Sequence, residues 1–300
     1  MAADYNQTLL DEAHMLKPDL FFAFKGANVT AQTLRQLKEQ GIVTIQFYPD
    51  TGFLEHSDQM RGTITEYDWF FSTKSDHVPQ LRNELNYTKV SYLPHGFDPE
   101  THCPTPVLDR DLADYACEAS FVGNISVKKL AMLDALRKAM PKLDLRIWGS
   151  PAWGECNLDL ANCYQGHPVW GSEYAKVAIL SKINLGLLFE GNVDGGADKI
   201  TARTFEIPSA GGFMLHERTD EVLKHFREDQ ECTMFSSTEE MIAKIRHFIT
   251  NEKDRRRIAQ AGRQRCLSSG YSTDDRARAV IEKFHELKAE LVPSGRKNQG

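Results

Sequence analysis

The stretch that decides the fold runs from Ala119 to Gly149 and reads ASFVGNISVKKLAMLDALRKAMPKLDLRIWG. It starts with a short apolar run, passes through a helical pattern over Lys128–Ala139, and ends in the strand-like segment Leu143–Gly149. A strand, a helix and a second strand in this order are typical of two parallel strands joined by a crossover helix. The stretch therefore predicts one such unit, with Gly123 directly after its first strand.

The same alternation is present earlier in the chain. A helical pattern over Asp4–Leu16 precedes the apolar run Leu20–Phe24, and a helix over residues 30–40 precedes a strand over residues 42–47. Strands are also predicted at residues 69–72 and 89–93, before a segment with two prolines that has the composition of a linker. Helices that alternate with strands indicate another parallel sheet.

After Gly149 the alternation continues with a helix over residues 172–181, a strand over residues 183–189 and a polar loop. The short helix Arg203–Ala210 then leads to a strand at residues 213–215, and the remainder is predicted to be mainly helical. Its last helix, Arg276–Leu291, is amphipathic. We predict an N-terminal domain over residues 1–105, a second domain over residues 106–275, and a terminal helix and tail over residues 276–300 that pack back on the first domain.

Composition and charge exclude several classes of protein. The 300 residues are 41% hydrophobic and 26% charged, and a net charge of -6 argues against nucleic acid as a main partner. The apolar runs are far shorter than the ~20 residues of a membrane-spanning helix, and the first residues lack a signal-peptide pattern, which predicts a cytoplasmic protein. The six cysteines form no C-x-x-C pair and the ten histidines no metal-ligand spacing, so no metal is predicted.

Four strings in order, LPHGFDP (93–99), SFVGN (120–124), RTFEIPSAGGFML (203–215) and the helical segment 235–265, resemble the spore-maturation, CgeB-like branch of the GT-B glycosyltransferases. The resemblance covers roughly residues 47–284 and is most specific in the second domain. It implies two Rossmann-like domains that face each other across a cleft. It also implies a nucleotide-diphosphate sugar as donor on the C-terminal domain, an acceptor on the N-terminal domain, and neither a metal nor a permanently bound cofactor.

The family resemblance also bears on the N-terminal domain and on partners. Family members usually begin with another strand and helix, whereas this sequence starts in a helical pattern. We therefore expect a short N-terminal domain, and a partner that completes it is one interpretation. The acceptor is predicted to be a glycan, a lipid, a protein or a small molecule.

Glycosyl transfer requires stabilisation of a leaving nucleotide diphosphate by backbone N–H groups and basic side chains. Gly123 and Asn124 stand where a strand gives way to a helix, so their amides are candidates for a phosphate contact, although a glycine there also suits an ordinary turn. Lys128 and Lys129 follow one turn later, where the family often has a basic residue.

Asp198 and Glu206 stand eight positions apart, a spacing that resembles the E-x7-E signature of retaining GT-B enzymes with Asp at the first position. The family role of Glu206 is to accept hydrogen bonds from the donor ribose hydroxyls, and Asp198 would reach the donor sugar. Arg203 and Lys199 are candidates for the diphosphate, and a surface ion pair is the alternative for Arg203. The remaining predicted donor-site residues are Thr204, His167, Val169, Gly211 and Gly212, of which the two glycines equally suit a helix end.

On the acceptor side, Asp50 follows a predicted strand and is a candidate to orient or deprotonate the acceptor hydroxyl, with turn or helix-cap duty equally open. His56 and His95 are the other candidate bases, because imidazole titrates near neutral pH. Retention is slightly favoured over inversion. Two alternative functions remain open at this point: a nucleotide-sugar 2-epimerase, and a protein that binds nucleotide or glycan without catalysis.

Overall fold

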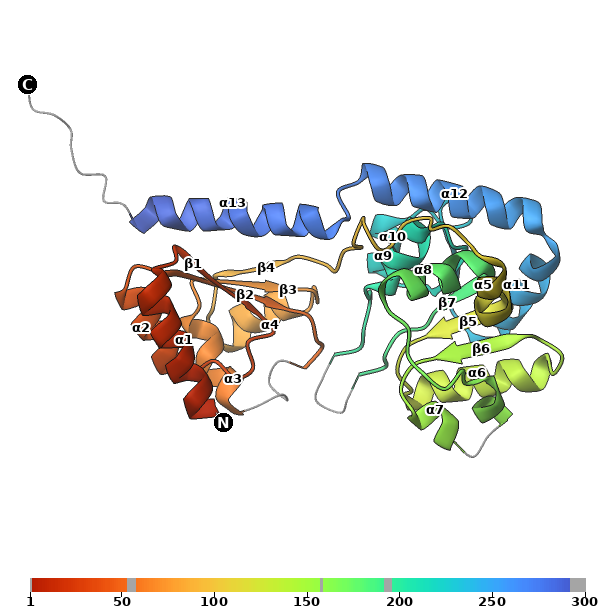
Figure 1. The fold of residues 1–300 in the computed structure, drawn as a ribbon, viewed down its shortest axis with the longest axis horizontal. Coiled ribbons are helices and arrows are strands. Elements are labelled where there is room, and N and C mark those ends of the chain that lie inside the picture. The colour runs from red at the N-terminus through yellow and green to blue at the C-terminus, as the bar shows by residue number, and fades with distance from the viewer. Residues whose placement is uncertain (1, 53–57, 157–158, 192–195, 292–300) are drawn as a thin grey trace, which may run out of the picture. The chain divides into compact units, whose positions relative to one another are not determined.

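A computed structural model of the chain describes residues 2–52, 58–156, 159–191 and 196–291 (Figure 1). The chain divides into two compact units. The first comprises Met1–Pro94, Gly191–Gly196 and Arg276–Gly300, and the second comprises His95–Glu190 and Ala197–Asp275. Each unit has its own parallel sheet, of four strands in the first and five in the second. The predicted fold class, an α/β protein with two parallel sheets, is therefore confirmed.

The sheet of the first unit has the strand order β1-β2-β3-β4. Its strands are β1 (Leu20–Phe24), β2 (Val43–Tyr48), β3 (Trp69–Ser72) and β4 (Val90–Tyr92). Its helices are α1 (Ala2–Leu16), α2 (Ala31–Glu39), α3 (Asp58–Thr63), the 3-10 helix η1 (Ile64–Glu66), α4 (His77–Glu84), and α13 (Thr273–Leu291) from Arg276 onward. Because right-handed crossovers join strands in sequential order, the connecting helices lie on one face, and α13 lies along the other (Figure 1).

Alternation along β2 divides the core of the first unit between these two faces. Val43 and Phe47 belong to the apolar cluster that contains Val280 of α13. Tyr48, the next residue, belongs instead to a cluster with Leu81 of α4. All six residues of β2 are buried, as expected for a strand covered on both faces. The terminal helix thus closes one face of this sheet.

The sheet of the second unit has the strand order β6-β5-β7-β8-β9. Its strands are β5 (Cys117–Val122), β6 (Leu145–Trp148), β7 (Ser181–Gly186), β8 (Met214–Glu217) and β9 (Thr233–Phe235). Its helices are α5 (Asp109–Tyr115), α6 (Val127–Ala139), α7 (Ala152–Glu155), the 3-10 helix η2 (Asp159–Cys163), α8 (Gly171–Leu180), α9 (Arg203–Ala210), α10 (Asp220–His225), α11 (Thr238–Thr250) and α12 (Glu252–Ser268). The strand–helix–strand unit predicted at residues 119–149 corresponds to β5, α6 and β6.

Two features of this unit differ from the sequence prediction. The strand β9 lies in the region predicted to be mainly helical, and the helix α5 begins inside the segment predicted to be a linker. The three residues of β9 are too few to display a periodic pattern, and they are fully enclosed because they pair with β8. Tertiary pairing rather than local sequence therefore determines this strand.

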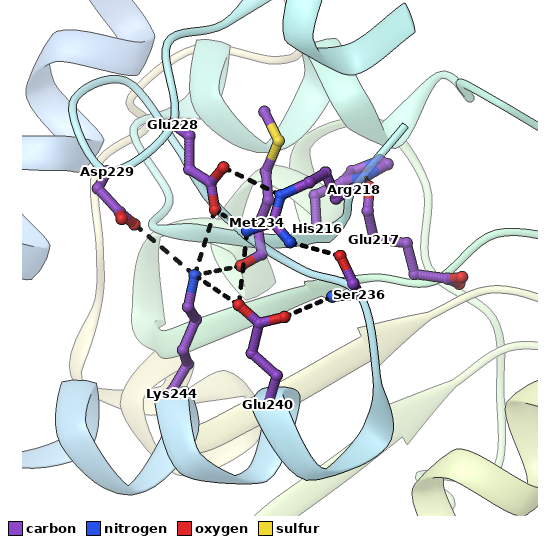
Figure 2. A network of polar contacts seen from close by, with 9 residues as sticks. All are labelled: His216, Glu217, Arg218, Glu228, Asp229, Met234, Ser236, Glu240 and Lys244. Atoms are coloured by element: carbon purple, nitrogen blue, oxygen red, sulfur yellow. Dashed lines mark hydrogen bonds and ion pairs between the residues drawn. The ribbon is translucent and has the colours of Figure 1, made fainter. Parts of the chain in front are cut away.

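An ion-pair network joins the end of β8 to α11 in the second unit (Figure 2). Arg218 pairs with Glu228 and lies 3.4 Å from Glu240, while the Lys244 ammonium lies 3.3 Å from each of the two glutamates. The four side chains are 21% to 34% exposed, so solvent screens them only in part. Hydrogen bonding from Arg218 lowers the pKa of the Glu228 carboxyl. The network fixes the segment between β8 and α11.

Candidate functional site

A cavity of about 360 Å³ opens in the second unit at the carboxyl ends of its strands. Its walls come from the ends of β5 and β6, from the loop before α8, from the first turns of α8 and α9, and from the segment before α5. The lining residues are His102, Val122, Gly123, Asn124, Gly149, Pro168, Val169, Trp170, Gly171, Tyr174, Arg203 and Glu206. Five of the residues predicted for a donor site, Gly123, Asn124, Val169, Arg203 and Glu206, are among them.

The strand order explains why a cavity forms at this edge of the sheet. The chain passes from β5 to β6 on one side and then returns to place β7 on the other side of β5. The connections after β5 and β7 therefore diverge, and open α/β sheets bind ligands in the crevice at such a switch point. Gly123 and Asn124 follow β5 directly and so lie at this crevice.

Two glycines allow the loops at the crevice to approach each other closely. Gly149 has a φ of +158°, and a Cβ atom there would lie 2.1 Å from the carbonyl oxygen of Gly123. A Cβ atom at Gly123, whose φ is +156°, would lie 3.0 Å from the Arg203 guanidinium. Side chains at either position would therefore fill the space between the loops, and the glycines leave backbone facing the cavity.

Arg203, the first residue of α9, presents a positive group to the cavity. Its Nη2 donates a hydrogen bond to the carbonyl oxygen of Leu187 at 2.9 Å, and the guanidinium lies over the Phe121 ring, 5.6 Å from the centroid. Within the described residues, its buried Nε has no hydrogen-bond partner. The guanidinium is thus fixed in place while retaining capacity to donate to an anion.

Glu206 lies one turn after Arg203 on α9, and its side chain is 20% exposed. Burial raises the pKa of its carboxyl to about 7, against the opposing effect of the Arg203 charge. The carboxylate lies 3.7 Å from Nε2 of His102. A carboxyl with this pKa in a polar cavity changes its charge near neutral pH, so a ligand that supplies hydrogen-bond donors would favour the ionised form.

The sequence prediction missed several lining residues, of which His102 and Tyr174 carry polar groups. His102 precedes α5, and its ring meets that of Tyr174 edge-on at 5.7 Å. The Tyr174 hydroxyl is buried and has no hydrogen-bond partner among the described residues, and burial raises its pKa. Tyr174 has the spacing of a core position on α8, so no sequence signal separated it from ordinary packing.

Trp170, Gly149 and Gly171 also line the cavity without having been predicted. The Trp170 side chain is 73% exposed although it stands directly before α8. A large exposed aromatic side chain at a cavity is available to stack on a flat ligand. The signal that could have identified it is a tryptophan directly after the predicted donor residues His167 and Val169.

Neither Lys128 nor Lys129 lines the cavity. The Lys128 ammonium lies 2.8 Å from Glu217, and its backbone N–H donates to Glu190. Lys129 is buried, and its ammonium donates to the carbonyl oxygen of Asn124 at 3.3 Å. Burial and the nearby Arg203 lower the pKa of Lys129 to about 8. Lys128 is thus paired away from the cavity, whereas Lys129 holds the loop that carries Asn124.

Other predicted donor residues lie in α9 or in the preceding loop but outside the cavity lining. The backbone N–H of Asp198 donates to Phe189, and the carbonyl oxygen of Lys199 accepts from Thr219. The Thr204 hydroxyl is buried and lies 3.0 Å from Nε2 of His216. Burial lowers the pKa of His216 to about 4.

His167, Gly211 and Gly212 also lie outside the lining. The His167 side chain is exposed and lies 3.0 Å from the carbonyl oxygen of Gln165. Gly211 ends α9 with a left-handed φ of +96°, and a Cβ atom at Gly212 would lie 2.6 Å from a backbone oxygen of α8. The two glycines thus end the helix and permit close packing of the following strand.

The predicted acceptor-side residues belong to different parts of the chain. Asp50 follows β2 in the first unit, where its carboxylate lies 2.6 Å from the Lys25 ammonium. His95 is the first residue of the second unit, beside a segment in which Phe97 pairs with Ser272. His56 lies outside the described residues.

Buried side chains hold the loop that carries Asp50. The Thr73 hydroxyl donates to the carbonyl oxygen of Pro49 at 2.8 Å, and the Tyr48 hydroxyl donates to that of Gly52 at 3.0 Å. Nε2 of His77 lies 2.6 Å from the carbonyl oxygen of Thr51. Three side-chain contacts, to the carbonyl groups of residues 49, 51 and 52, thus fix the backbone on both sides of Asp50, as in sites that require a set geometry.

Two features are absent from the residues that the structure describes: a group of metal ligands and a membrane-spanning helix. No group of three or more His, Cys, Asp or Glu side chains there is arranged to hold a metal ion. None of the helices in the same residues is long and apolar enough to cross a membrane.

Two parallel sheets in an α/β fold, with a cavity at the switch point of one of them, are an architecture typical of nucleotide-binding proteins. A model of the family described as glycosyl transferase-like matches residues 128–282, more than half of the chain, and the chain belongs to this family. It is therefore a glycosyltransferase of the GT-B class, whose donors are nucleotide sugars. A search among curated proteins found no significant match.

Solved structures share the fold at low sequence identity. Sucrose-phosphate synthase from Thermosynechococcus elongatus is 13% identical with a TM-score of 0.69, over 95% of this chain and 78% of that one. HepE from Anabaena in complex with UDP-glucose is 10% identical with a TM-score of 0.68, over 95% and 82%. Trehalose 6-phosphate synthase from Burkholderia multivorans is 10% identical with a TM-score of 0.67, over 100% and 77%.

Proposed function

We propose that the cavity of the second unit binds the nucleotide diphosphate of the donor, with Glu206 on the ribose hydroxyls and Arg203 on the diphosphate. The backbone of Gly123 and Asn124 lies against the phosphates, and the nucleobase lies along Val169 with Trp170 available for stacking. The observation that carries the proposal is that these residues, distant in sequence, line one cavity. A CgeB-like place within the family is part of the proposal and rests on the string at residues 203–215.

The charges around the cavity suit an anion that also carries hydroxyl groups. Arg203 lines the cavity, and Lys129 is held behind the loop that carries Asn124, where burial lowers the pKa of its ammonium to about 8. A diphosphate would accept hydrogen bonds from the Arg203 guanidinium and from backbone N–H groups of the lining. Among the described residues of the lining, Glu206 is the single carboxylate, and a carboxylate accepts hydrogen bonds from two hydroxyls at once.

For the acceptor side we assign Asp50 as the group that orients or deprotonates the acceptor hydroxyl. Its support is the fixed loop geometry and the ion pair with Lys25, whose backbone is left-handed at a φ of +65°. Retention is favoured on the spacing of Asp198 and Glu206 alone, and NMR observation of the first-formed anomer would test it.

A thermal-shift screen tests donor binding. Purified protein would be heated with UDP, GDP, ADP, CMP, dTDP and their sugar conjugates in the presence of a chelator, so that any response is independent of metal. A nucleotide at about 100 times its Kd stabilises the native state by about 2.7 kcal/mol, which corresponds to a shift on the order of 5 °C. Absence of a shift with every nucleotide would contradict the proposed donor site.

Two glutamine variants test whether the nucleotide binds in this cavity. Glu206→Gln should weaken nucleotide binding by about 1–3 kcal/mol, because a charged acceptor of hydrogen bonds is lost. Glu228→Gln is the matched control, since it removes a partly buried carboxylate that does not line the cavity. Equal binding by Glu206→Gln and the wild type, in a folded variant, would remove Glu206 from the site.

A further inference from the structure

His102 lies far from α9 in sequence and yet contributes its side chain to the same cavity. It follows β4 by ten residues and precedes α5, in a segment without regular secondary structure. Its side chain is 13% exposed. A polar ring that is enclosed in this way needs partners for both nitrogens, and these partners define its role.

The backbone fixes the proton position on the His102 ring. The N–H of Asp98 donates to Nδ1 at 3.0 Å, and because a backbone N–H only donates, Nδ1 must be the acceptor. The neutral ring therefore carries its proton on Nε2. The burial of the ring lowers the pKa of His102, which favours this neutral form near neutral pH.

The protonated nitrogen is the one nearest Glu206. Nε2 lies 3.7 Å from Oε1 of Glu206, which is slightly beyond hydrogen-bond distance. Hydrogen bonds in sites without ligand are often long and shorten when the ligand binds. The edge-on contact with Tyr174 restricts rotation of the His102 ring, so Nε2 stays directed at Glu206. Because Nε2 and Oε1 are only 3.7 Å apart, a small movement of the Glu206 side chain is enough to form the hydrogen bond.

Three side chains in the described part of the chain lie near the Glu206 carboxyl: Arg203, Tyr174 and His102. The Arg203 guanidinium is held by Leu187 and by the Phe121 ring, and no hydrogen bond joins the Tyr174 hydroxyl to Glu206. In this part of the chain, the side-chain nitrogen that lies within 4 Å of the carboxylate is His102 Nε2. It is therefore the group placed to fix the orientation of that carboxylate.

We infer that His102 is a positioning residue for Glu206: its Nε2–H donates to one carboxylate oxygen and turns the carboxylate towards the ribose hydroxyls of the donor. The inference rests on the proposed function, because it requires Glu206 to bind ribose. No covalent step is involved. The His102 imidazole keeps its proton throughout, and one hydrogen bond forms between Nε2 and Oε1 when the nucleotide binds.

The test compares nucleotides with and without a ribose hydroxyl. UDP, or whichever of GDP and ADP gives the larger thermal shift, would be titrated calorimetrically beside its 2′-deoxy form. His102→Phe keeps a flat ring against Tyr174 but has no donor, and we expect it to weaken ribonucleotide binding about 5- to 20-fold, in line with one charge-assisted hydrogen bond. Binding of the 2′-deoxynucleotide by His102→Phe should be weaker than in the wild type by about 3-fold at most. His102→Gln places an amide N–H near the same point and should restore most of the ribonucleotide affinity.

Two further readouts separate positioning from packing. The ribonucleotide affinity of the wild type should fall as Glu206 is protonated below about pH 7, and in His102→Phe the midpoint of this fall should move to higher pH because the carboxylate has lost a donor. When Glu206→Gln is already present, adding His102→Phe should lower the ribonucleotide affinity by about 2-fold or less. His102→Asn serves as the short, polar variant if the phenylalanine variant does not fold.

The outcomes distinguish the inference from the proposed function. Equal losses for the ribo and deoxy forms in the His102 variants, or no loss in either, would overturn the inference while Glu206→Gln still weakens binding. A wild-type protein that binds no nucleotide, or a Glu206→Gln variant that binds like the wild type, would instead overturn the proposed function. A selective loss for the ribo form, rescued by glutamine, supports both.

Discussion

The two sheets differ in strand order, and this difference decides where each unit gathers its polar groups. In the second unit the order β6-β5-β7-β8-β9 reverses direction beside β5, and a cavity of about 360 Å³ lies at that edge. In the first unit the described strands run in simple order from β1 to β4 and have no such reversal. A switch point draws adjacent loops apart, whereas sequential order leaves them side by side.

The polar groups follow the same division. At the switch point, Arg203 and Glu206 on a short helix face glycine loops that come from two different strands. In the first unit, Asp50 stands on one loop whose carbonyl oxygens are held by neighbouring buried side chains. The first arrangement makes room for a large ligand, and the second fixes one carboxylate.

The largest effect is expected where the loops of the second unit touch. Gly149→Ala would place a Cβ atom 2.1 Å from the carbonyl oxygen of Gly123 at a φ of +158°. Because the backbone must move to make room, we expect the free energy of unfolding to fall by about 3–5 kcal/mol. We also expect the variant to lose the thermal shift that nucleotide induces in the wild type. Gly166→Ala is the control, because its φ is +84° but its Cβ atom meets nothing within 4 Å, and it should cost about 1 kcal/mol. Chemical denaturation measures both, and equal costs would show that the loop contact is unimportant.

The next effect concerns the loop of the first unit. Burial lowers the pKa of His77 to about 4, below the usual value of 6.5. The unfolded chain therefore binds more protons between these values, so stability is full above pH 6.5 and falls as pH drops towards 4. His77→Gln cannot titrate, and we expect its stability to be about 1–3 kcal/mol less sensitive to acid over this range.

Hydrogen exchange of the β2 and β3 amides, measured from pH 7 to pH 4, reports the stability of the first unit alone. A loss of protection at low pH that is smaller in His77→Gln would assign the effect to this unit. At neutral pH the variant should still cost about 1 kcal/mol or more, because glutamine reproduces the two ring contacts imperfectly. Nucleotide affinity in the second unit should be unchanged. An unaltered acid sensitivity in the variant would show that His77 is not the group that titrates.

These expectations depend on contacts that the sequence reveals unevenly. The strands of both sheets are short apolar runs, and the helices between them follow a period of 3.6, so most of the fold could be predicted from local pattern. Arg203 and Glu206 were predictable because they lie three residues apart on a helix with a family string around it. Gly123 was predictable as a glycine between a strand and a helix.

The missed residues have no local signature. His102 meets Glu206 across more than one hundred residues, and only the folded sheet brings the two together. Tyr174 has the spacing of a core residue, and Lys128 stands at a suitable helix start but is drawn to Glu217. Residue type and local period predict which element a side chain belongs to, whereas its partners depend on long-range packing.

A smaller effect on stability is expected at the carboxylate of the cavity. Burial raises the pKa of Glu206 to about 7. The native state therefore holds its proton more tightly than the unfolded chain, and this group makes the protein less stable as pH rises from about 4.5 through 7. Glu206→Gln has no carboxyl to ionise. Its free energy of unfolding should therefore equal that of the wild type at pH 4.5 and exceed it by about 1–2 kcal/mol at pH 8.

Urea denaturation at these two pH values, without nucleotide, measures the Glu206 effect. His77 and His216 titrate over an overlapping range in both proteins and cancel in the difference. A variant that is less stable than the wild type at pH 8 would contradict the buried, weakly compensated carboxylate. It would mean that Glu206 forms a strong ion pair in the native state instead.

The smallest effect is expected in the ion-pair network that braces the second unit away from its cavity (Figure 2). Glu228→Gln removes the charge that Arg218 and Lys244 share, and we expect a loss of about 1 kcal/mol because the groups are only partly buried. Contact with Arg218 lowers the pKa of Glu228, so this contribution is present above the pKa of a free carboxyl and is lost as pH falls through the lower, native value. Salt should weaken it in the wild type and not in the variant. Unchanged nucleotide affinity in Glu228→Gln would separate the stability of the second unit from its cavity, whereas a matching loss of affinity would mean that the segment after β8 is coupled to the switch point.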